Sequence, residues 1–408
     1  MAHKLQNNSH IHYWFLGQYF GELIILTCIM LRRILGKAVQ NQPLGLVLLL
    51  SIVAFIIILP GIFLINPQEE HLSKLKTWQR YARLFNHYLQ ALSQALILPG
   101  ILMVLSSMLQ SKVSFWNNTI FIIIMLYSLI MYIPVGILAL SRIQAVSGRL
   151  LTTMFMALII LGTPLTNNHN LNKILLDFIH SGFLAAMSFI VLTLIVMQIW
   201  NFSLPKLAWP TQGSKKVLTF LVILCLVFIF FNTFSTATNW QQLLTHFDFH
   251  ISALSLNFIL SGLEAGLLEE WLCRFIFLYL LLRALQNRSW QLDAAVIGSS
   301  FIFSLIHLTN LIAQNWLTTL NQAAFAFSIG IFLAALYLYT KAFWWPVIFH
   351  ISLDLLSFIT SGHTTMAAPS QFKWQLSLLI MAVFLVTALF LLSGSRREIM
   401  HKNVSELL

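Results

Sequence analysis

Long apolar runs alternate with short polar segments along almost the whole chain. A helix needs roughly 20 apolar residues to cross the hydrocarbon core of a bilayer. This pattern predicts about twelve membrane-spanning helices, near residues 14–31, 44–65, 88–109, 118–141, 150–165, 175–199, 217–235, 251–282, 292–313, 319–340, 342–361 and 375–393. The run at 150–165 is short. The run at 14–31 carries Glu22 in its middle, so a helix lying on the membrane surface is an alternative there.

Composition supports an all-α, polytopic transmembrane helical bundle. Hydrophobic residues make up 59% of the 408 residues and charged residues only 9%, whereas a soluble domain carries roughly 25% charged residues. The formal net charge is +11. In a membrane protein such an excess usually lies in cytoplasmic loops beside anionic lipid. We therefore expect membrane lipids, and no nucleic acid, as its partners.

The basic residues and the segment 200–216 suggest the orientation and the division of the chain. Basic residues beside the later spans fall on one side, which we assign to the cytoplasm together with the C-terminus: Lys215, Lys216, Arg283, Arg288, Arg396, Arg397 and Lys402. The segment 200–216 contains prolines, a glycine and lysines. We expect an N-terminal transmembrane region of unknown role at 1–210, a functional domain at 211–395, and a cytoplasmic tail at 396–408.

One predicted span carries four ionisable residues, Glu264, Glu269, Glu270 and Arg274. Each charge at a helix centre costs roughly 2.5–3.5 kcal/mol on insertion scales, so these side chains must face the protein interior or a wet cavity. Glu270 and Arg274 are four residues apart, so they share a helix face and can pair. Glu269 is rotated by about 100° from Glu270 and is free to act on another group.

Two later spans add histidines at the same apolar depth. Phe303 and His307 are four residues apart, as are His350 and Asp354. A glutamate and two histidines can position and activate a water molecule near neutral pH, and a carboxylate commonly orients an imidazole. Each pair alone is also compatible with a structural role. Together, in an otherwise nearly uncharged region, they indicate a functional site.

The order of these motifs resembles the CPBP family, the CAAX-prenyl-protease and bacteriocin-processing intramembrane proteases that are also called Abi proteins. The sequence has EExxxR at Glu269–Arg274, then FxxxH at Phe303–His307 and HxxxD at His350–Asp354. An aromatic run and Pro346 just before His350 fit as well. The resemblance covers roughly residues 250–362, about a quarter of the chain.

The resemblance implies roles for the motif residues. Glu269 and His307 would activate the attacking water, and His350 would stabilise the oxyanion. Glu270, Arg274 and Phe303 would support these groups. Asp354 stands where the prenyl-protease branch has asparagine. Because an ionised aspartate cannot donate a hydrogen bond to an oxyanion, we expect it to orient His350, and the departure weakens the case for prenylated CAAX substrates.

The sequence therefore predicts an intramembrane endopeptidase that acts on a peptide or a lipid-associated protein substrate without a cofactor. Zinc is an alternative, bound by Glu269, His307 and His350 with an open fourth position. Two other functions remain open: a non-hydrolytic CPBP-fold protein in bacteriocin self-immunity or an accessory role, and a transporter, for which no internal repeat is visible. The expected location is a bacterial plasma membrane.

Overall fold

The protein is an all-α chain that divides into two compact units. The computed structural model describes residues 5–35, 44–65, 76–109, 114–166, 170–205, 209–210, 213–366 and 368–408. Unit 1 is Met1–Phe202 and unit 2 is Ser203–Leu408. Within these described ranges the regular elements are helices, and strand-like pairing is confined to one isolated bridge, Ser235 to Phe247. The predicted all-α fold is thus confirmed.

Unit 1 is a bundle whose helices enclose a few polar side chains. Its elements are α2 (Ser9–Leu35), α3 (Leu44–Ile62), η1 (Phe63–Ile65), α4 (Thr77–Met108), α5 (Ser114–Ser128), α6 (Ile133–Leu138), η3 (Leu140–Arg142), α7 (Val146–Gly162), α8 (Lys173–His180) and α9 (Phe183–Ile199). Glu22 of α2 is buried and accepts a hydrogen bond from Gln94 of α4 (2.9 Å). Tyr19 donates to Gln90 (2.8 Å), one turn before Gln94 on α4. Tyr19 and Glu22 of α2 thus point into unit 1.

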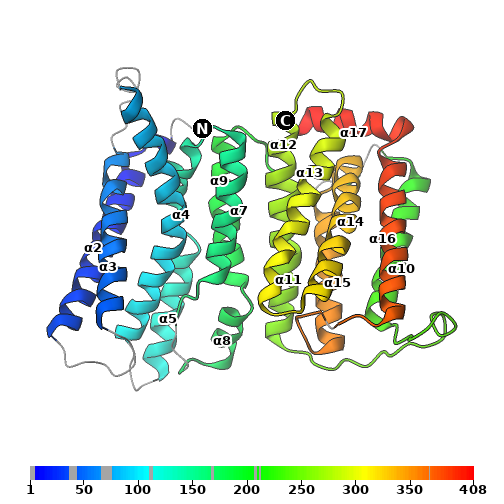
Figure 1. Ribbon diagram of the computed structural model, residues 1–408, viewed down its shortest axis with the longest axis horizontal. Coiled ribbons are helices and arrows are strands. Elements are labelled where there is room, and N and C mark those ends of the chain that lie inside the picture. Colours follow the sequence, from blue (N-terminus) through cyan, green and yellow to red (C-terminus); the bar gives the residue numbers. More distant parts are fainter. Residues whose placement is uncertain are drawn as a thin grey trace. The chain divides into compact units, whose positions relative to one another are not determined.

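Unit 2 is built around α14, its most enclosed long helix (Figure 1). Its elements are α10 (Lys215–Phe234), α11 (Leu256–Glu270), the π-helical segment η4 (Trp271–Phe277), α12 (Leu278–Ala284), α13 (Gln291–Ile306), η5 (His307–Ile312), α14 (Trp316–Thr340), α15 (Trp344–Ser361), α16 (Gln371–Leu391) and α17 (Gly394–Leu407). Helices α13, α16 and α17 pack on α14, and α15 packs on α10 and α11.

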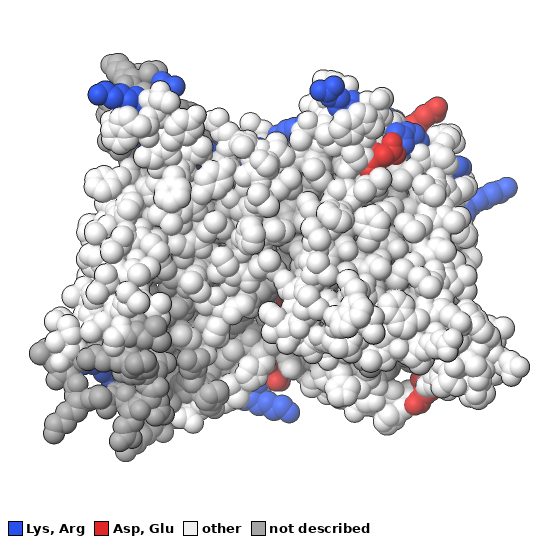
Figure 2. Space-filling view, in the orientation of Figure 1, with Lys and Arg blue, Asp and Glu red and all other residues white. Residues whose placement is uncertain are grey.

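Seven of the described helices are long and apolar enough to cross a membrane, or eight if the bent pair α8–α9 forms one span. The sequence predicted about twelve. The other predicted segments are helical too: Leu48–Ile62 and Val146–Gly162 are shorter apolar helices, while α11–α12 and α15 carry the polar motifs. In Figure 2 most charged side chains on this face of each unit lie near the helix ends, with a largely uncharged band between them. The chain is a multi-pass membrane protein.

The segment predicted as a tail folds as helix α17 and packs on other helices of unit 2. Met400 and Leu407 are buried, and the Asn403 amide donates to the carbonyl oxygens of Leu338 (2.8 Å) and Tyr339 (3.1 Å). Arg397 makes a bidentate ion pair with Asp293 of α13 (2.6 and 2.7 Å). The hydrogen bonds that Arg397 donates to Asp293 raise the pKa of the Arg397 guanidinium above its ordinary value.

Helices α11 and α15 meet almost backbone to backbone at two glycines of α11. Gly262 and Gly266 are four residues apart and share one face. A Cβ atom on Gly266 would lie 2.5 Å from the backbone nitrogen of Ile351, and one on Gly262 would lie 2.8 Å from Cα of Leu355. Small residues at this spacing allow membrane helices to approach closely. The contact sets the distance between the polar residues of α11 and those of α15.

We expect Gly266→Ala to destabilise the protein, because the methyl group would meet the Ile351 backbone, which cannot rotate away. The expected loss is about 1–3 kcal/mol, the usual cost of overpacking. Thermal unfolding of the purified protein measures it. Gly100→Ala is the matched control, since no atom lies within 4 Å of that Cβ position. Equal melting temperatures for the two variants would contradict this view of the α11–α15 contact.

Candidate active site

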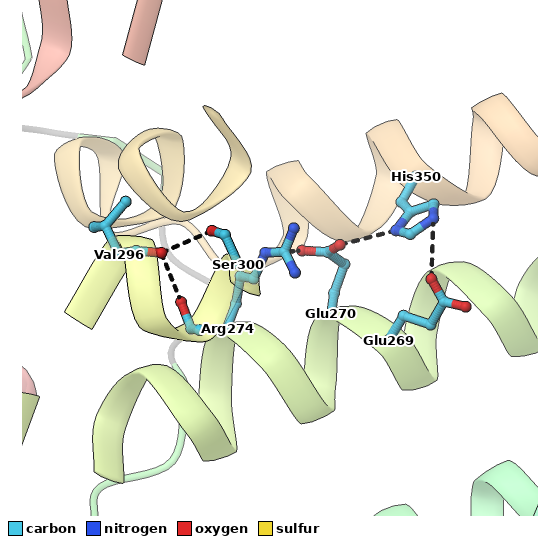
Figure 3. Close-up of polar contacts among 7 residues, drawn as sticks. Glu269, Glu270, Arg274, Val296, Ser300 and His350 are labelled. Atoms are coloured by element: carbon cyan, nitrogen blue, oxygen red, sulfur yellow. Dashed lines mark hydrogen bonds and ion pairs between the residues drawn. The ribbon is translucent and has the colours of Figure 1, made fainter. Parts of the chain in front are cut away.

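Glu270, at the end of α11, links two other charged or polar side chains of the predicted site (Figure 3). Its side chain is 0% exposed. Oε2 lies 3.0 Å from Nε of Arg274, and Oε1 lies 2.8 Å from Nδ1 of His350. The i,i+4 pair with Arg274 is the one that the sequence predicts. His350 comes from α15, so its contact with Glu270 joins the EExxxR motif directly to the HxxxD motif.

Arg274 is buried on the opposite side of Glu270 from His350. It lies in η4, where the helix widens into a π-helical turn, a feature that is frequent at functional sites. The guanidinium carbon is 4.7 Å from the centroid of the Phe303 ring, a cation–π contact. Among the described residues, its two terminal nitrogens have no hydrogen-bond partner. Glu270 and the Phe303 ring therefore supply the principal stabilisation of this buried charge.

His350 faces carboxylates with both ring nitrogens. Nδ1 contacts Glu270, while Nε2 lies 3.3 Å from Oδ2 of Asp354 and 3.5 Å from Oε2 of Glu269. Glu269 and Asp354 are partly accessible, with 28% and 24% of their side chains exposed. The site thus has an enclosed half, formed by Glu270 and Arg274, and an accessible half at Glu269 and Asp354.

Phe303 and His307, the FxxxH motif, lie beside His350. The Phe303 ring packs edge to face against both imidazoles, with centroids 4.7 Å from His307 and 6.0 Å from His350. Nδ1 of His307 lies 3.0 Å from the carbonyl oxygen of Phe303 and donates to it in the neutral ring. Its Nε2 then carries the lone pair. His307 also lies within electrostatic reach of Glu269.

Helices α13 and α14 hold Phe303 in position. A Cβ atom on Gly330 of α14 would lie 3.1 Å from Cβ of Ser300 and 3.2 Å from Cδ1 of Phe303. The Ser300 hydroxyl is turned back to its own helix, where it donates to the carbonyl oxygen of Val296 (2.7 Å; Figure 3). The absence of a side chain at Gly330 therefore lets α14 support the face of α13 that carries Phe303.

The structure brings all the predicted site residues into one region, and it adds one contact that the sequence analysis missed. That analysis paired Glu270 only with Arg274 and gave the orienting of His350 to Asp354. In the structure Glu270 contacts Nδ1 of His350, whereas Asp354 and Glu269 both lie near Nε2 of the same ring. No spacing signal marks this contact, because Glu270 and His350 are 80 positions apart. Glu264 also lies within electrostatic reach of His350.

The described side chains do not form a metal site. Within the described ranges, no group of three or more His, Cys, Asp and Glu residues is arranged to hold a metal ion. The zinc alternative, with Glu269, His307 and His350 as ligands, has no support in this geometry, and we derive no step through a metal. It stays a prediction that chelation can test.

Comparison with known families identifies the segment that carries this site. Residues 251–356 match the family described as type II CAAX prenyl endopeptidase Rce1-like. The match covers about a quarter of the chain and includes every site residue named above. It confirms the family resemblance that the motifs indicate: this part of unit 2 is similar to the Rce1-like family, which is consistent with a CPBP intramembrane protease. Neither the curated proteins nor the solved structures gave a match.

We expect Arg274→Met to destabilise the protein strongly. Removal of one partner of a buried ion pair leaves the other charge uncompensated, at a cost of about 3–5 kcal/mol. The double variant Glu270→Gln/Arg274→Met should recover most of this loss, because the neutral amide oxygen still accepts from Nδ1 of His350. Denaturation in mixed micelles measures both. A double variant as unstable as Arg274→Met alone would contradict the role assigned to the pair.

Proposed function

We propose that the protein is an intramembrane endopeptidase that hydrolyses a peptide bond with water activated by Glu269 and His307. The observation that carries the proposal is an accessible carboxylate at apolar depth. Glu269 keeps 28% of its side chain exposed, whereas its neighbour Glu270 is 0% exposed. A carboxylate that faces an accessible space beside two imidazoles is able to hold a water molecule and take its proton.

His307 is placed to share that task. Its Nδ1–H is committed to the Phe303 carbonyl, so Nε2 is the nitrogen that accepts a proton in the neutral ring. The edge-to-face contact with Phe303 fixes the ring plane. In the proposed step, the water oxygen attacks the carbonyl carbon of the peptide, and its proton passes to Glu269 or His307. The same proton then goes to the leaving amine.

His350 is the proposed oxyanion partner. Both of its ring nitrogens face carboxylate oxygens, so an imidazole protonated on both can donate on both sides. When the tetrahedral oxyanion forms, the Nε2–H can donate to it, and Asp354 stabilises the positive ring. Glu270 holds Nδ1 from the enclosed half of the site. This assignment gives the aspartate a role that does not require a hydrogen-bond donor.

The proposed substrate is a peptide or a lipid-associated protein. The family description names CAAX prenyl endopeptidases, and this supports testing a prenylated CAAX peptide first. Asp354 stands where the prenyl-protease branch has asparagine. This difference supports testing other membrane-associated peptides as well as the prenylated one. A double-glycine-leader bacteriocin precursor is the second test substrate.

We also propose that the end of unit 2 where α10 begins and α17 lies faces the cytoplasm. We call it the basic end, because most described Lys and Arg residues of unit 2 lie at it: Lys215, Lys216, Arg283, Arg288, Lys341, Arg396, Arg397 and Lys402. Such an excess favours the cytoplasmic side. A Lys402→Cys variant without Cys28 should resist a membrane-impermeant thiol reagent in right-side-out vesicles. It should react after permeabilisation. Labelling before permeabilisation would show that the basic end faces away from the cytoplasm.

The catalytic proposal predicts that Glu269→Gln lowers cleavage of the active test substrate by about a hundredfold or more, because the amide cannot take a proton from water. Cleavage is followed by mass spectrometry with the purified protein, with and without a zinc chelator. Glu398→Gln, an exposed change on α17, is the control and should leave the rate unchanged.

Each outcome of this experiment has a distinct meaning. Cleavage that persists in a folded Glu269→Gln variant contradicts the proposed mechanism. Cleavage that chelation abolishes favours the zinc alternative. If neither peptide is cleaved, the non-hydrolytic role gains support. A Glu269→Gln protein that works like wild type in the cell would then establish that role.

A further inference from the structure

Unit 2 contains a cavity of about 350 Å³ that none of the proposed catalytic residues lines. It lies between α10 and α16, over one face of α14. Helix α10 packs on α15 and α16 packs on α14, and aromatic side chains fill part of the space between them. Phe228, Phe325 and Phe384 form a mutually contacting wall, and Ile380 and Val383 continue it. Most of the cavity surface is therefore apolar.

One end of the cavity is polar and contains two unsatisfied groups. Asn321, at the start of α14, is only 1% exposed. Its Oδ1 accepts from the hydroxyl of Ser377 (3.1 Å), which leaves Nδ2 without a partner in the described part of the chain. Across the cavity, the buried hydroxyl oxygen of Ser235 also has no partner among described residues. A buried polar group without a hydrogen bond is costly, so a ligand that supplies acceptors would be stabilised here.

Lys373 adds a positive charge to the lining of the cavity. It lies in the first turn of α16 and lines the same cavity. Among the described Lys and Arg residues of unit 2, it is the one at the end opposite the basic end. Among the described residues that line the cavity, none is an aspartate or a glutamate. The polar end thus offers an ammonium group, an amide N–H and a hydroxyl, a set that suits an anion.

The segment before α11 covers this end of the cavity. Leu243 and Met366 line it from the connecting segments. The Trp240 indole N–H donates to Gln375 of α16 (3.2 Å), and its ring packs edge to face on Phe372. The polar groups therefore lie near the helix ends, where the headgroup of a bilayer lipid lies, while the aromatic wall extends towards the middle of the helices.

We propose that this cavity binds a single-chain amphiphile with an anionic headgroup, either a carboxylate or a phosphate. The headgroup accepts hydrogen bonds from Asn321, Ser235 and Lys373, and the alkyl chain lies along the Phe228 wall. The volume is near the lower limit of ordinary ligand sites, which suits one alkyl chain. The site is separate from the proposed catalytic groups, so this inference does not depend on the proposed protease activity.

The test is a titration of the purified full-length protein, followed by native mass spectrometry. The probes are oleate, oleoyl lysophosphatidate and oleyl alcohol, which share a chain and differ in the headgroup. We expect one equivalent of each anion to bind, and the alcohol to bind at least about tenfold more weakly. Lys373→Met and Asn321→Leu should weaken both anions by about tenfold and leave the alcohol unchanged. Lys402→Met, on exposed α17, is the control and should bind like wild type.

The outcomes separate the sources of the ligand and can overturn the proposal. Tighter binding of oleate points to a free fatty acid, and tighter binding of the phosphate points to a lysophospholipid. The proposal is wrong if neither anion binds, if the alcohol binds as tightly as oleate, or if folded Lys373→Met keeps wild-type affinity. Because Lys373 is exposed, this variant tests the site even where Asn321→Leu fails to fold.

Discussion

The buried carboxylate of Glu270 is the interaction on which the site depends. A charge at this depth is tolerated only when paired and hydrogen-bonded. Arg274 engages one of its oxygens and His350 engages the other. The two partners come from η4 and α15, so a single carboxylate joins two parts of unit 2. The glycine contact between α11 and α15 makes this possible, because bulkier residues at 262 and 266 would separate the two helices.

The same arrangement divides the site into an enclosed half and an accessible half. Glu270 and Arg274 are enclosed, whereas Glu269 and Asp354 stay accessible. Adjacent glutamates point to different surroundings because successive helix positions are rotated by about 100°. Phe303 lies between the halves, in contact with Arg274, His307 and His350. In the proposed mechanism, the enclosed half keeps the imidazole in position while the accessible half acts on a substrate.

The parts of this picture that follow from helix periodicity could be predicted from the sequence. Glu270 with Arg274 and His350 with Asp354 meet because residues four apart share a helix face. The contact between Glu270 and His350 could not be predicted, since it depends on how α11 and α15 pack. Helix α17 was expected to be a tail because its residues are largely polar. Its buried face becomes evident only where Met400, Val404 and Leu407 pack against unit 2.

The central claim is that a water molecule held by Glu269 attacks the peptide directly. A single-turnover cleavage in ¹⁸O-labelled water, with enzyme in excess over substrate, tests it. Direct attack by water places one ¹⁸O atom in the new carboxyl terminus of the product and none in the Glu269 side chain. Label recovered in Glu269 would indicate a covalent acyl intermediate on that residue and would contradict the account.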